Sequence, residues 1–179
     1  NAAPLPSKLQ NSSQADDIQT YLSLIQYSDE ALRELIEHYK SIDEPTMIVF
    51  FGDHQPSFAS ELVKTYYPDK TTQEQRLIGS ATPFIIWTNY DSPSEEDIVV
   101  SPSILGAMVA QQAGFDLPAL PNLIMSRIYS KISVAHEAGV VSRENGTIYD
   151  IDHLPENLQT EWDKWQKLCY YYLFDFQTQ

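Results

Sequence analysis

One short apolar segment that ends in a sharp polar turn most constrains how this chain can fold. Thr46-Met47-Ile48-Val49-Phe50-Phe51 is followed directly by Gly52-Asp53-His54-Gln55-Pro56. A run that is apolar on both faces is typical of a strand buried in a sheet that helices cover. Because ligands in such sheets lie beyond the carboxyl ends of the strands, Asp53 and His54 stand where a functional site is expected.

The neighbouring segments complete an α/β pattern. Apolar residues recur at helical spacing from Asp17 to Lys40, with Asp16 or Asp17 as the expected N-cap. A second buried strand is predicted at Pro83–Thr88, and Ser101 is expected to cap a helix that Gly114 ends. Shorter helices are predicted over 58–67 and 122–129, and 69–80 is expected to be a surface loop.

The tail follows a different pattern. Val140-Val141 and Thr147-Ile148-Tyr149 flank a turn that contains Asn145-Gly146, which predicts a β-hairpin. Apolar residues at helical spacing over 155–174 predict a terminal helix that docks through Trp162 and Trp165.

Charge and composition exclude several classes of protein. The chain has 179 residues, with 11 Lys and Arg against 25 Asp and Glu, a net charge of −14. A nucleic-acid binder needs a basic stripe against the phosphates, and a membrane-surface helix needs a basic face; neither occurs here. No apolar run approaches the roughly 18–20 residues of a membrane span. The single cysteine, Cys169, excludes a disulfide framework and a zinc site built from cysteines.

Asp53 and His54 are the candidate metal ligands. Together they offer a carboxylate oxygen and an imidazole nitrogen, donors that suit Zn²⁺ or Mn²⁺. The alternative, which spacing alone leaves open, is a simple turn in which Asp53 caps the following segment and His54 is exposed.

Three segments together resemble a known family. They are the helix and strand of Tyr21–Pro56 with its Phe-Gly-Asp-His-Gln-Pro end, the strand segment Thr82–Tyr90, and Ser101–Leu117 with its Ser-Pro-Ser-Ile-Leu-Gly start. These segments are similar to those of the lipoteichoic-acid synthase-like phosphoglycerol transferases, in the sulfatase branch of the alkaline-phosphatase superfamily. The resemblance covers about residues 18–135 and weakens in the tail.

The resemblance implies a fold, a metal and a reaction. The fold would be the C-terminal part of an alkaline-phosphatase/sulfatase-like α/β sandwich, with a mostly parallel sheet flanked by helices, plus the hairpin and terminal helix. A divalent metal, manganese foremost and zinc or magnesium as alternatives, would lie at the carboxyl edge of the sheet. In the family the Gly-Asp-His motif supplies metal ligands, which assigns that role to Asp53 and His54. A threonine on the metal takes up the phosphoglycerol group and passes it on.

The resemblance also implies that parts of the site lie upstream. The polar, aperiodic residues 1–17 predict a flexible lead-in or cloning remnant, and the resemblance makes 18–135 the C-terminal part of a catalytic domain, with the hairpin and helix at 136–179. No threonine stands in a nucleophile context, and His38, His136 and His153 are interpreted as structural or exposed. We therefore expect no catalytic residue here, weak or absent metal binding, and no activity of the chain alone.

The partners and location follow from the same resemblance. Its partner would be the N-terminal remainder of its own domain, and the substrate a phosphoglycerol lipid or polyglycerolphosphate. The parent would lie in a bacterial cell membrane with its catalytic domain outside, whereas this chain would be soluble and could dimerise through uncovered apolar surface. Two alternatives stay open: a non-catalytic α/β interaction or substrate-recognition domain, and a sulfatase or phosphoethanolamine transferase of the same superfamily.

Overall fold

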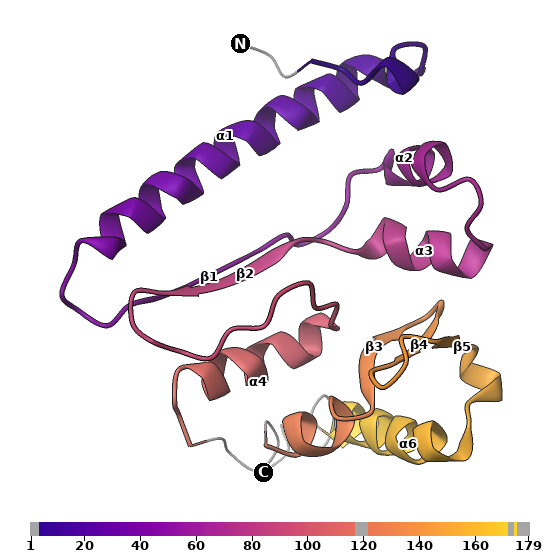
Figure 1. Ribbon diagram of the computed structural model, residues 1–179. Helices are drawn as coiled ribbons and strands as arrows, with labels where there is room; N and C mark the ends of the chain where they lie inside the picture. Colours follow the sequence, from indigo (N-terminus) through magenta and orange to yellow (C-terminus); the bar gives the residue numbers. More distant parts are fainter. Residues whose placement is uncertain (1–3, 117–121, 172–173, 175–179) are drawn as a thin grey trace. The chain divides into compact units, whose positions relative to one another are not determined.

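The computed structural model describes residues 4–116, 122–171 and 174. They form two compact units, Asn1–Asp91 and Ser92–Gln179 (Figure 1). The first holds a 3-10 turn at Ser7–Leu9, then α1 (Ala15–Lys40), β1 (Met47–Phe51), α2 (Ala59–Tyr66), α3 (Thr72–Ser80) and β2 (Phe84–Thr88). The second holds α4 (Pro102–Gln112), a π-helical turn (Ile124–Ile128), β3 (Ile132–His136), β4 (Gly139–Ser142), β5 (Ile148–Tyr149), a 3-10 turn (Ile151–His153) and α6 (Glu156–Tyr170).

The strands β1 and β2 form where the apolar runs predict them, but they pair antiparallel. Met47 lies opposite Thr88 and Phe51 opposite Phe84. Between them α2 and α3 lie side by side beyond the end of β1, so the chain turns back there and enters β2 next to the point where it left β1 (Figure 1). A parallel partner would need a connection that returns along the whole of β1. The α/β class is confirmed, whereas the expected mostly parallel sheet is wrong for every strand pair of the described residues.

The strands are also less buried than a run apolar on both faces predicts. Phe50, Phe51 and Ile85 are exposed. Among the described residues each of the two strands has only the other as its neighbour in the sheet, so these side chains have no further strand beside them.

Part of the segment 1–17, which is expected to be a flexible lead-in, belongs to a hydrophobic cluster. Leu9 is buried and packs with Ile18 and Phe58 in one of the hydrophobic clusters of this unit. Gln14 is the N-cap of α1, and Asp16 and Asp17, expected as caps, lie in its first turn. There their charges still favour the helix through its dipole.

Helix α3 occupies part of the segment 69–80 that polarity predicts to be a loop. Thr71 and Glu74 form a capping box: Thr71 Oγ1 accepts from the amide of Glu74 at 3.2 Å, and Glu74 Oε2 accepts from that of Thr71 at 2.8 Å. The hydrogen bond from Lys70 to the Glu74 carboxylate, together with those from Thr71, lowers the pKa of Glu74 to about 2. In the sequence, the Thr-x-x-Glu spacing of this capping box is the pattern that indicates the start of a helix here.

Asn89 holds the connector between α1 and β1 against the end of β2. Its Nδ2 lies 3.1 Å from the carbonyl oxygens of Tyr39 and Ile42 and 2.9 Å from that of Glu44. Its Oδ1 accepts from the Thr46 amide at 2.8 Å. One side chain thus satisfies the backbone groups of a turn that precedes it by more than 40 residues.

The second unit has its own core. Ile128, Ile132, Val140 and Leu158 are buried together, and Trp162 and Trp165 of α6 pack against them. The sheet is antiparallel in the order β3-β4-β5. The predicted hairpin is confirmed, with Gly146 at a positive φ of 69° in its turn, and so is the terminal helix.

The predicted position of Ser101 at the start of α4 is confirmed, but its side chain bonds elsewhere. It is the N-cap residue of α4, with Pro102 first in the helix, but its hydroxyl makes no capping bond. Instead Ser101 Oγ donates to the Ala135 carbonyl at 3.2 Å and accepts from the Ala135 amide at 2.7 Å, which ties the start of α4 to β3.

The predicted division at 18–135 and 136–179 rests on the resemblance and stays a prediction.

Within the described ranges, no helix combines the length and the apolar character needed to cross a membrane.

Candidate functional site

Asp53 and His54 follow the carboxyl end of β1, where the sequence places them. Their side chains are 82% and 80% exposed. They lie on the turn that leads from β1 toward α2, and α2 has Phe58 as its N-cap. Asp53 therefore does not cap α2, although its Oδ1 accepts a hydrogen bond from the next amide, that of His54, at 2.8 Å.

This turn is fixed on both sides to the segment that enters β2. The Gly52 amide donates to the Pro83 carbonyl at 3.0 Å, and Thr82 Oγ1 donates to the Gly52 carbonyl at 2.9 Å. The side-chain amide of Gln55 donates to the Ala81 carbonyl. A Cβ on Gly52 would lie 3.0 Å from the Cβ of Thr82, so the close approach of the two segments favours glycine here.

A backbone carbonyl stands beside one ring nitrogen of His54. Its Nδ1 lies 3.0 Å from the Gln55 carbonyl oxygen, which can only accept, so this contact favours a proton on Nδ1. In the neutral ring with that proton, Nε2 carries the lone pair. Nε2 lies 3.5 Å from Oδ2 of Asp53, so a nitrogen and an oxygen donor face the same small space. A backbone carbonyl on the other ring nitrogen is the usual arrangement behind a metal-ligating histidine.

The pair fits two adjacent ligands of one divalent ion. Ligands about 2.0–2.2 Å from a tetrahedral ion lie about 3.4 Å apart, close to the separation of these donors. A complete site needs three or four protein donors. No cluster of three or more His, Cys, Asp or Glu suited to a metal occurs in the part of the chain that the structure describes. The two residues therefore offer half of a metal site.

The remaining histidines have local surroundings. The His38 ring contacts Tyr39 edge-on, with centroids 5.1 Å apart, and His136 Nδ1 accepts from the Ala138 amide at 2.9 Å. His153 is exposed on a 3-10 turn. These positions agree with the structural or exposed roles expected from the sequence.

Comparison with known proteins identifies relatives of this chain. The model of the family named Sulfatase matches residues 3–115. A cyclic beta-1,2-glucan modification protein of Rhizobium meliloti (strain 1021) is 28% identical over 133 residues, which are 71% of this chain and 20% of that protein. The capsular polysaccharide biosynthesis protein RkpI of the same organism is 36% identical over 58 residues, 31% of this chain and 10% of that protein.

A solved structure has a similar fold. It is the Streptococcus pyogenes phosphoglycerol transferase GacH in complex with sn-glycerol-1-phosphate, with a TM-score of 0.61 and 16% identity. The match covers 89% of this chain and 36% of that one, and at this identity it speaks for the fold alone. The chain spans a fifth or less of the length of the two Rhizobium relatives.

Proposed function

Because this chain belongs to the sulfatase family, we propose that it is part of a metal-dependent catalytic domain that transfers phosphoglycerol groups to a cell-envelope polysaccharide. In this proposal Asp53 and His54 supply two ligands of the metal. One observation carries it: Nε2 of His54 and Oδ2 of Asp53 lie 3.5 Å apart on a turn that neighbouring backbone groups hold in place.

The class of reaction and substrate is supported by the relatives. Two of them are named for the modification or synthesis of polysaccharides, and GacH is a phosphoglycerol transferase. We propose manganese as the metal and the outer face of a bacterial membrane as the location of the whole protein. A lipoteichoic-acid-like polyglycerolphosphate is the second candidate product, beside a decorated glucan or capsule.

The chain's own residues have a limited role in this chemistry. When bound, a divalent metal lowers the pKa of a coordinated hydroxyl and offsets the charge on phosphoryl oxygens. Asp53 and His54 would hold the ion, and a proton on Nδ1, directed at the Gln55 carbonyl, would leave the lone pair of Nε2 available as a ligand. With a net charge of −14, this chain offers little attraction for an anionic substrate, so we assign that task to the metal and to residues outside this chain.

We expect the chain alone to be catalytically silent. Two protein ligands without a nucleophile do not suffice for transfer or hydrolysis. With bis(p-nitrophenyl) phosphate and Mn²⁺, the release of nitrophenol should equal that of buffer with Mn²⁺. Hydrolysis above that level that disappears in Asp53→Ala would contradict this expectation.

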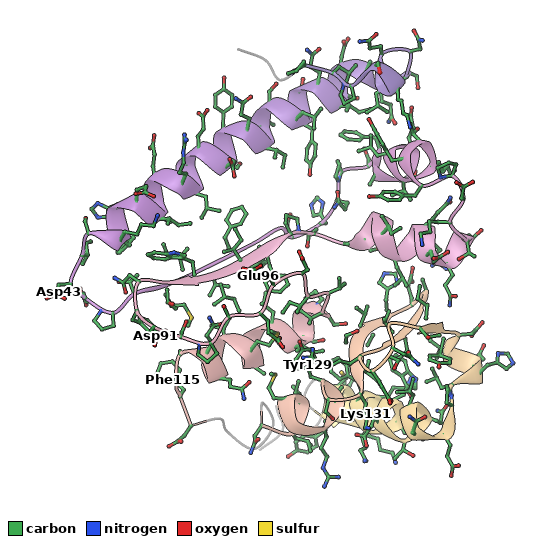
Figure 2. The ribbon with its side chains drawn as sticks, in the orientation of Figure 1. Asp43, Asp91, Glu96, Phe115, Tyr129 and Lys131 are labelled. Atoms are coloured by element: carbon green, nitrogen blue, oxygen red, sulfur yellow. The ribbon has the colours of Figure 1, made fainter. Side chains whose placement is uncertain are left out.

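The metal pair itself is tested by Mn²⁺ titration observed by NMR. Paramagnetic broadening detects weak binding, so even half a site should give a localised signal. We expect the amide signals of residues 52–55 to broaden at lower Mn²⁺ than those of the acidic loop 91–97, and Asp53→Ala to remove this preference. Asp43→Ala is the matched control, an exposed aspartate in the connector that precedes β1 (Figure 2). If residues 52–55 still broaden before residues 91–97 in Asp53→Ala, the metal assignment is wrong and the simple turn is favoured.

A further inference from the structure

A cavity lies beside the Asp53–His54 turn, between α2, α3 and the residue that follows His54. Its volume is about 280 Å³. Eight residues line it: Gln55, Ala59, Leu62, Val63, Tyr66, Tyr67, Ile78 and Gly79. All of them lie in the first unit, and no sequence motif pointed to it.

Gln55 connects this cavity to the candidate metal ligands. Its carbonyl holds Nδ1 of His54 at 3.0 Å, while its side chain lines the cavity and donates to the Ala81 carbonyl. The cavity wall and the two donors are therefore parts of one short, tethered turn. Asp53 and His54 are not among the lining residues, so Gln55 is the residue that links the cavity to them.

The lining fits a neutral ring with apolar faces and hydroxyl edges. None of the eight residues carries a charge, and Tyr66 and Tyr67 are 42% and 48% exposed. Lys8 stands over the Tyr66 ring, with Nζ 5.4 Å from its centroid, and so supports that ring. Ligand pockets combine aromatic and apolar walls with a few polar groups, and this volume is near the lower limit of about 300 Å³. That size suits a single hexose, and the eight lining residues themselves offer no charge that would pair with a phosphate.

We propose that this cavity is the subsite for the acceptor saccharide, holding one glucose unit of a neutral glucan against Gln55 of the turn that carries Asp53 and His54. The inference rests on the proposed function, because it assigns the acceptor side of that reaction. Tyr66 and Tyr67 line the cavity and offer aromatic surface to the sugar, although Lys8 covers one face of the Tyr66 ring, and Gln55 offers polar contact where the cavity meets the turn.

The test uses this chain and sophorose, a β-1,2-linked glucose disaccharide, in an NMR titration. Signals of α2, α3 and Gln55 should shift with a single saturating curve. In Gly79→Leu the added Cβ lies 3.6 Å from Cγ2 of Val63, and the rest of the side chain would occupy the cavity. The substitution also replaces a glycine that weakens α3. We expect at least a tenfold weaker affinity in Gly79→Leu, and a change of less than twofold in Ser80→Leu, the matched exposed position on the same helix.

Other outcomes would overturn the inference. Equal affinity in Gly79→Leu and Ser80→Leu would do so, as would shifts that fall outside α2, α3 and Gln55, or no shifts at all. A second variant, Tyr67→Leu, keeps an apolar wall but removes a ring, and it should also bind more weakly. If Mn²⁺ broadens the signals of residues 52–55 but sophorose shifts no signals, the saccharide subsite is refuted and the metal pair is not. Sophorose shifts with no such broadening support the cavity and refute the metal pair instead.

Discussion

Asn89→Asp is expected to lower the free energy of unfolding of the first unit by about 3 kcal/mol, the largest effect on stability that we predict. The Asn89 amide nitrogen faces the carbonyl oxygens of Tyr39, Ile42 and Glu44 at 2.9–3.1 Å. In the aspartate these three acceptors would face a carboxylate oxygen and lose their donor. Repulsion then adds to the loss of hydrogen bonds, although the Thr46 amide keeps an acceptor.

The measurement combines urea unfolding with amide hydrogen exchange in β1. The Thr46 connector and β1 should exchange faster, because the turn before β1 loses its contact with β2. Asn11→Asp makes the same chemical change at an exposed position and should alter the free energy of unfolding by less than about 0.5 kcal/mol. If the two variants unfold at the same urea concentration, Asn89 does not hold the connector in place.

Local patterns of the sequence predicted most helices and strands. The apolar runs that became β1 and β2 and the period of α1 depend only on nearby residues. The direction in which β1 and β2 pair depends instead on how residues 52–83 fold, because α2 and α3 turn the chain back. Pairing direction is a property of the connection, and the strand sequences carry no signal for it.

Two other features show what local patterns overlook. Helix α3 has mostly polar residues, and only the capping box of Thr71 and Glu74 distinguishes it from a loop. Asn89 looks like an ordinary residue after a strand, and its partners lie more than 40 positions away. Such tertiary hydrogen bonds require coordinates.

The sequence also predicted only part of the candidate site. Asp53 and His54 were found from their place after an apolar strand and from a family motif. The hydrogen bonds that hold their turn in place could not be predicted, because Ala81, Thr82 and Pro83 are near Gly52 and Gln55 only in the folded chain. The contact of His54 Nδ1 with the Gln55 carbonyl and the cavity beside Gln55 likewise follow from the structure alone.

The second large effect concerns activity, and it tests the central claim that Asp53 and His54 bind the catalytic metal. In a protein that carries the whole catalytic domain, Asp53→Ala should lower Mn²⁺-dependent hydrolysis of a phosphoglycerol ester more than about 100-fold. Loss of a residue that only supports a ligand costs about 10–100-fold, and loss of the ligand itself should cost more. Because Asp53 is 82% exposed in this chain, removing its side chain should leave the fold intact.

Asp43→Ala supplies the comparison, since it removes an exposed aspartate from the opposite end of β1 (Figure 2). The decisive measurement is the hydrolysis rate of the two variants at saturating Mn²⁺, with thermal unfolding recorded for both. The account predicts a rate more than about 100-fold lower in Asp53→Ala and within about twofold of the unchanged protein in Asp43→Ala. Equal rates in the two variants, both properly folded, would contradict the assignment of Asp53 to the metal.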